Sequence, residues 1–79
     1  MNSIPISRII KKTNVVVSGN EFHISTVLLP YEDFRGIVEY ETMITKNDEW
    51  LDYQERCDTL NEAKEQHELT VRLVKQKLI

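Results

Sequence analysis

The chain has 79 residues, enough for one small domain with one modest hydrophobic core and too few for two domains. Its single cysteine, Cys57, excludes an intramolecular disulfide, and a lone thiol is typical of a reducing compartment. The apolar stretches are much shorter than a signal peptide or a membrane span requires. We therefore expect a soluble, cytoplasmic domain without membrane contact.

The net charge of -3 is distributed unevenly along the chain. Residues 1–19 carry three basic side chains and no acidic one, residues 20–68 carry all 13 acidic side chains against four basic ones, and residues 69–79 carry three basic side chains. The acidic middle argues against a nucleic-acid-binding domain of the common basic kind. A basic patch would still form if the two ends met in space, through Arg8, Lys11, Lys12, Arg72, Lys75 and Lys77.

The basic residues 1–12 are expected to form a loose arm or a short helix. After this arm, three strands are expected in the first half of the chain. The run Val15-Val16-Val17 predicts a strand at 13–18, because β-branched residues suit strands, and Gly19-Asn20 is typical of a two-residue hairpin turn. Alternating apolar positions predict a second strand at 21–29.

Pro30 and Gly36 bound a predicted loop, because proline cannot donate to a strand ladder and glycine permits unusual backbone angles. Alternation resumes at 37–44 and predicts a third strand, which a polar turn follows. The segment 50–57 fits either a fourth strand or the start of a long helix.

Thr59 and Glu62 match the capping box that opens helices, in which the threonine hydroxyl accepts from the third helical amide and the glutamate reaches back to the cap amide. A cap would be wasted inside a continuous helix, so a break near Asp58 favours a strand at 50–57. The predicted fold is α+β: one domain over 1–79, with an antiparallel meander of three or four strands packed against one C-terminal helix. The expected core is Phe22, Ile24, Leu28, Val38, Tyr40, Ile44, Leu51, Tyr53, Leu60, Ala63, His67, Val71, Val74 and Leu78.

No sequence motif indicates catalysis or cofactor binding. His23, Cys57 and His67 are isolated in the sequence, whereas a metal site needs several ligands at matched spacing. The two glycines are too far apart for a phosphate-binding loop. We therefore expect no catalytic, cofactor or metal site and a protein that is not an enzyme, with Cys57 a buried thiol and His67 a helix histidine hydrogen-bonded to the sheet.

Two surface features suggest binding. Glu39 and Glu41 share one face of the third predicted strand, and Asp52 on the neighbouring strand would fall beside them, giving an acidic face that either binds a basic partner or only aids solubility.

Leu69 and Leu73 lie nearly opposite the core stripe of the helix. With Trp50 they are candidates for an exposed apolar patch and for self-association as a homodimer, because a domain of this size has little stability of its own.

The motifs Ser25-Thr26-Val27-Leu28 and Tyr40-Glu41-Thr42-Met43, followed by Thr59, Glu62-Ala63 and His67, resemble those of a family of small uncharacterised phage and prophage proteins. The resemblance covers about residues 22–75 and departs from the family pattern at Pro30–Gly36, where relatives have a longer loop. It implies a phage origin and expression in a bacterial cytoplasm, and it implies no catalytic residue.

These observations together predict a phage-encoded accessory protein that binds a host protein or defence complex through its acidic sheet face, with inhibition of that protein as one consequence. A small nucleic-acid-binding module that uses the basic termini, and a minor virion assembly protein, are the alternatives.

Overall fold

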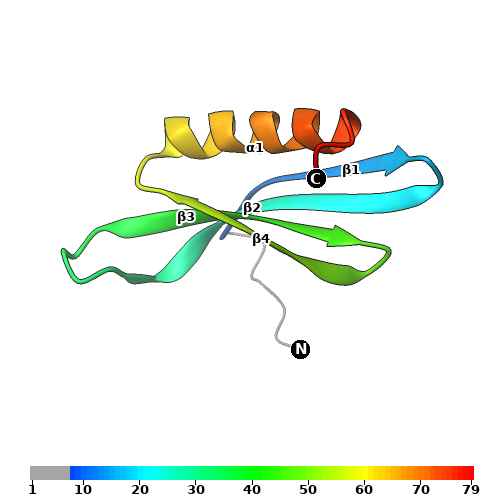
Figure 1. Ribbon diagram of the computed structural model, residues 1–79. Helices are drawn as coiled ribbons and strands as arrows, with labels where there is room; N and C mark the ends of the chain where they lie inside the picture. The colour runs from blue at the N-terminus through cyan, green and yellow to red at the C-terminus, as the bar shows by residue number, and fades with distance from the viewer. Residues whose placement is uncertain (1–7) are drawn as a thin grey trace.

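The structure, a computed structural model, describes residues 8–79 and contains four strands and one helix. The strands form one antiparallel sheet in the order β1-β2-β3-β4, and α1 lies across one face of it (Figure 1). The predicted α+β meander with a C-terminal helix is therefore confirmed, and the segment 50–57 is a strand. The elements are β1 (Ile9–Val17), β2 (Asn20–Glu32), β3 (Val38–Lys46), β4 (Glu49–Cys57) and α1 (Leu60–Lys75).

The first strand begins earlier than the sequence predicted. Residues 9–12 belong to β1, where Lys11 pairs with Thr26 and Lys12 with Ser25, so the expected basic arm is wrong for these residues. A bulge between Ile9 and Lys11 takes up one residue of β1, which lets the apolar start of the strand join the ladder. The remaining part of the expected arm, residues 1–7, lies outside the described residues.

The hairpin turn lies one residue before the predicted Gly19-Asn20 pair. Ser18 and Gly19 both have positive φ angles, 51° and 79°, as a type I′ turn requires, while Asn20 already pairs with Val17. The turn between β3 and β4 also has two residues at positive φ, Asn47 and Asp48.

The core lies between α1 and the sheet face it covers. Its buried cluster is Phe22, Ile24, Ile44, Val71 and Val74, all of them predicted, with Leu51 and Tyr53 packed at its margin. Three other expected core residues are exposed: Val38, Leu60 and Leu78. Val38 and Leu60 are the first residues of β3 and α1, and Leu78 follows the end of α1, so none of them lies between the two layers.

The core also contains a polar network centred on His67, which is fully buried. Its Nε2 lies 2.8 Å from the hydroxyl of Thr13 and its Nδ1 2.8 Å from the hydroxyl of Thr26, which in turn lies 2.7 Å from that of Thr42. The predicted hydrogen bonding of His67 to the sheet is confirmed, and the two buried threonines of β2 and β3 were not predicted.

Within residues 8–79, the single helix is 16 residues long and rich in charge, so it lacks both the length and the apolar character that crossing a bilayer requires.

Candidate protein-interaction groove

A groove runs between α1 and the C-terminal end of β4. Its volume is about 380 Å³. The helix contributes residues spaced three or four apart, which therefore lie on one side of α1. The lining residues are Arg56, Cys57, Glu62, Glu65, Gln66, Leu69 and Arg72. We call this feature the α1–β4 groove.

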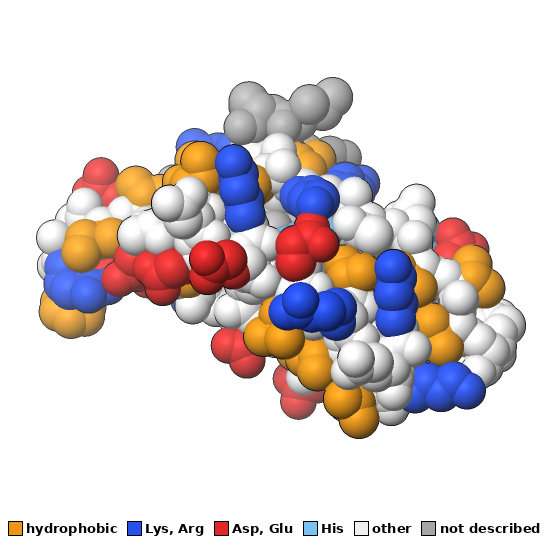
Figure 2. All heavy atoms as spheres, turned by 90° about the horizontal axis from the view of Figure 1, so that it is seen from above, with side chains coloured by type: hydrophobic (Ala, Val, Ile, Leu, Met, Phe, Trp, Pro, Cys, Tyr) orange, Lys and Arg blue, Asp and Glu red, His pale blue; other side chains and the backbone are white. Residues whose placement is uncertain are grey.

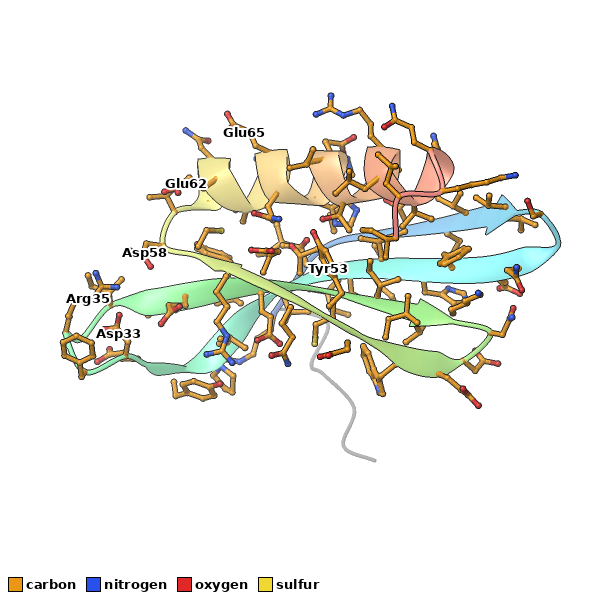
Figure 3. All side chains as sticks on the ribbon, in the orientation of Figure 1. Asp33, Arg35, Tyr53, Asp58, Glu62 and Glu65 are labelled. Carbon is orange, nitrogen blue, oxygen red and sulfur yellow. The ribbon has the colours of Figure 1, made fainter. Side chains whose placement is uncertain are left out.

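The charged side chains that line the groove are two glutamates, Glu62 and Glu65, and two arginines, Arg56 and Arg72, and its Glu62 end lies at the more acidic end of the molecule. Pairing of Glu41 with Arg56 brings the segments 31–41 and 55–65 together, and these segments carry eight acidic side chains against three basic ones. Viewed from the helix side, a row of acidic side chains lies toward this end, beside basic ones at its tip, and several basic side chains lie in the middle and toward the other end (Figure 2). Figure 3 shows Asp58, Glu62 and Glu65 at the start of α1.

The floor of the groove is partly apolar. Leu69 is 43% exposed and contributes an apolar surface to this floor. Beneath the helix, Tyr53 points toward α1 (Figure 3), where its hydroxyl lies 2.9 Å from the Thr70 hydroxyl and accepts from Gln66 Nε2 at 3.5 Å. These contacts hold α1 at a fixed position above β4.

Cys57 in the groove wall is suited to packing and not to nucleophilic attack. Burial raises the pKa of its thiol, and the nearby carboxylates of Glu62 and Asp58 raise it further, so the thiol is protonated at neutral pH. Its Sγ donates to the carbonyl of Thr59 at 3.8 Å. His67 turns both ring nitrogens to threonine hydroxyls, so the two residues form no Cys-His pair.

β4 is an edge strand of the sheet. Along its outer side, its backbone N–H and C=O groups pair with no strand of the described chain, which makes it a template for a further strand. A bulge opposite Ile44 interrupts the ladder between β3 and β4, while residues 54–57 pair regularly with β3. The regular part of this edge borders the α1–β4 groove.

The three carboxylates of the predicted acidic face do not form one exposed surface. Glu41 is only 5% exposed and accepts from Arg56 Nε at 2.7 Å, so its charge is neutralised within the protein. Glu39 is half-buried and lies beyond the pair of Tyr40 and Cys57, whereas the exposed Asp52 lies in the bulge of β4. The acidic end of the molecule is formed by the segments 31–41 and 55–65, which the pairing of β3 with β4 brings together. A correct prediction of this pairing from the sequence would have located the acidic end.

The predicted apolar patch is likewise divided. Trp50 is 55% exposed and pairs with Thr45, next to the buried Ile44, so it lies on the sheet face that α1 does not cover. Leu69 and the half-buried Leu73 lie on α1, on the other side of the sheet. Leu69 instead belongs to the α1–β4 groove.

The basic residues near the two ends of the chain converge only in part. Lys11 forms an ion pair with Glu68 on α1, and Arg72 lies near the same carboxylate, where both cations lower its pKa, Lys11 most strongly. Lys12 follows Lys11 along β1 and therefore faces the opposite side of the sheet. Arg8 donates to the carbonyl of Leu29 at 3.0 Å.

Among residues 8–79, no three histidine, cysteine or carboxylate side chains cluster closely enough to hold a metal ion. Comparisons with protein-family models, with curated proteins and with solved structures found no match to this chain.

Proposed function

We propose that this is a phage-encoded accessory protein that binds a bacterial host protein, and that its α1–β4 groove accepts an extended basic segment of that partner. One observation carries the proposal: a groove that contains Glu62, Glu65 and an exposed leucine, with Arg56 and Arg72 also in its lining, lies beside a free sheet edge. The phage origin rests on the resemblance of the strand and helix motifs.

In this proposal the partner segment adds to the sheet as a fifth strand along β4. Main-chain hydrogen bonds to the strand edge supply affinity, and every second side chain of the segment enters the groove and supplies specificity. Lysine or arginine would lie near Glu62 and Glu65, and an apolar side chain would cover Leu69.

Panning a library of random peptides against the immobilised protein tests this proposal without knowledge of the partner. We expect the selected peptides to combine lysine or arginine with apolar residues at every second position. Their binding should weaken as salt increases, because added salt screens exposed charges.

Two matched charge reversals locate the site. Glu62→Lys with Glu65→Lys changes the mouth of the groove, and Glu39→Lys with Asp52→Lys changes the uncovered sheet face by the same charge. We expect the first pair to abolish binding of the selected peptides and the second to leave it nearly unchanged. Loss of binding only with the second pair would assign the site to the sheet face, and peptides without basic residues would contradict the proposed partner chemistry.

A further inference from the structure

The side chains along the helix side of the α1–β4 groove follow a fixed order of charge. Four of the lining residues are spaced three or four apart on α1 and form one row: Glu62, Glu65, Leu69 and Arg72. Both glutamates are exposed, and within residues 8–79 neither of them forms a salt bridge. The row therefore begins with two carboxylates, continues with an apolar side chain and ends with a guanidinium group.

The two arginines of the groove differ in the state of their charge. Arg56 Nε donates to the buried carboxylate of Glu41 at 2.7 Å, so the charge of Arg56 is neutralised within the protein. Arg72 is exposed, and no acidic side chain among residues 8–79 forms a salt bridge with it, because the nearby Glu68 pairs with Lys11. Arg72 is therefore the cation that a bound segment would meet.

The helix runs back along β4, which aligns the row with the strand edge. Only residues 58–59 separate β4 from α1, and the Cys57 Sγ donates to the carbonyl of Thr59, so the acidic start of the row lies beside the end of the strand. Farther along, the Tyr53 hydroxyl lies 2.9 Å from that of Thr70 (Figure 3). Arg72 follows Thr70 by two residues and therefore lies near the level of Tyr53.

The length of the row matches a short extended segment. Glu62 and Arg72 are ten positions apart on α1, which is about 15 Å at a helical rise of about 1.5 Å per residue. Four steps of a strand cover about 13 Å, and every second side chain lies on the same face. Three successive side chains on one face of a segment would therefore lie beside the two glutamates, Leu69 and Arg72 in turn.

We propose that the α1–β4 groove selects the direction of the bound partner segment, with basic residues first, an apolar residue next and an acidic residue last, at alternate positions from its N-terminus to its C-terminus. All strand pairs of the sheet are antiparallel, and antiparallel pairing is slightly more stable than parallel pairing. A segment that adds antiparallel to β4 starts near Cys57 and ends near Tyr53, which places its basic end beside the glutamates. This inference rests on the proposed function and adds the direction of the segment to it.

Two synthetic peptides of one composition test the inference. The first has the order Lys-Thr-Lys-Thr-Val-Thr-Glu-Thr-Ser and the second has the reverse order, both with acetylated and amidated ends, so length, net charge and hydropathy are the same. Titration of the isotopically labelled protein, followed by NMR shifts of the β4 amides, measures both affinities even when binding is weak. We expect the first peptide to bind about 10-fold more tightly, because reversal replaces attractive charge pairs with repulsive ones at both ends of the row.

Arg72→Glu and Lys75→Glu are matched variants for the same titration. Both residues are exposed basic residues in the last turn of α1, but Arg72 belongs to the groove lining and Lys75 does not. We expect Arg72→Glu to reduce the preference for the first peptide to about twofold or less, and Lys75→Glu to leave it at about 10-fold. Thermal unfolding should change by similar amounts in the two variants, because each replaces one cation near the end of the helix dipole.

Equal affinities of the two peptides, or tighter binding of the reversed one, would overturn the inference. In either case the shifts of the β4 amides would still support the proposed function, because a segment would still bind at this edge. A preference that survives Arg72→Glu would also overturn the inference. If neither these peptides nor any peptide from panning shifts the β4 amides, the proposed function fails and the inference fails with it.

Discussion

At the scale of single residues, the most unusual feature is the row of hydroxyl and imidazole groups inside the core. Thr26 occupies the middle of this row, because its hydroxyl lies within hydrogen-bond distance of both His67 and Thr42. A buried polar group costs free energy when it lacks a partner, so each member of the row stabilises the fold only while its neighbours are present.

Replacing Thr26 with valine should therefore destabilise the domain. The substitution keeps the shape of the side chain but leaves the Nδ1 of His67 and the hydroxyl of Thr42 without this partner, which should lower the free energy of unfolding by about 1–3 kcal/mol. Thr45→Val is the control, because Thr45 lies on the uncovered face of the sheet and takes no part in the row. Urea denaturation of both variants measures the difference, and equal midpoints would contradict the role given to Thr26.

His67 should also make stability depend on pH. Burial lowers the pKa of His67 below its ordinary value of 6.5, and the nearby Lys11 lowers it further. At a pH below the ordinary pKa, the unfolded chain binds a proton at His67 that the folded chain does not. The free energy of unfolding should therefore fall as the pH falls from about 7 to about 5.5, a range that lies above the one in which carboxyl groups ordinarily titrate. In a His67→Gln variant this decrease should be much smaller. The same decrease in both proteins would assign the pH dependence to other groups.

At the scale of secondary-structure elements, the start of α1 follows the prediction from sequence. The Thr59 hydroxyl accepts from the backbone N–H of Glu62 at 3.2 Å, which is the expected cap. The side chain of Glu62 differs from the expected capping box, because it accepts from the Thr59 hydroxyl at 2.9 Å instead of reaching the cap amide. Both contacts depend on the same hydroxyl group.

Thr59→Ala should remove both contacts and lower the free energy of unfolding by about 1 kcal/mol, the usual cost of a lost N-terminal cap. Thr59→Ser keeps a hydroxyl at the same place and should restore most of that loss. Chemical denaturation of the three proteins provides the comparison. If serine were no better than alanine, the hydroxyl would not be what stabilises the start of α1.

The sequence predicted the elements well because their signals are local. Alternation located β2 and β3, and the cap at Thr59 separated β4 from α1. The earlier start of β1 was not predicted, because Lys11 and Lys12 have poor strand preference and are held there by pairing with β2. Propensity likewise could not decide which glycine-containing pair would form the hairpin turn, since the register of β1 with β2 sets it.

The candidate site was predicted less well because it depends on contacts between elements. Glu39 and Glu41 share a strand face, as predicted, but the sequence could not show that Arg56 would neutralise Glu41. The α1–β4 groove combines residues of a strand and a helix that follow different periods. The sequence placed Leu69 opposite the core stripe of the helix, and only the packing of α1 on the sheet showed what lies beside it.

At the scale of the whole molecule, charge and shape follow the same long axis. The domain measures 41 × 26 × 20 Å, with the acidic segments 31–41 and 55–65 at one end and Lys46 and Lys77 at the other. The net charge of -3 conceals this separation, because it sums over both ends. A basic partner should approach the acidic end, where Glu62 and Glu65 of the α1–β4 groove lie.

Amide hydrogen exchange along the sheet edges tests the central claim, that a partner segment binds as a fifth strand beside β4. With a peptide selected by panning present in excess, we expect amides of β4 near residues 54–57 to exchange more slowly, because the added strand pairs with the outer side of this edge. The amides of β1, the other edge, serve as an internal control and should exchange at an unchanged rate. Binding of the peptide with no added protection on β4, or with protection confined to β1, would contradict the account.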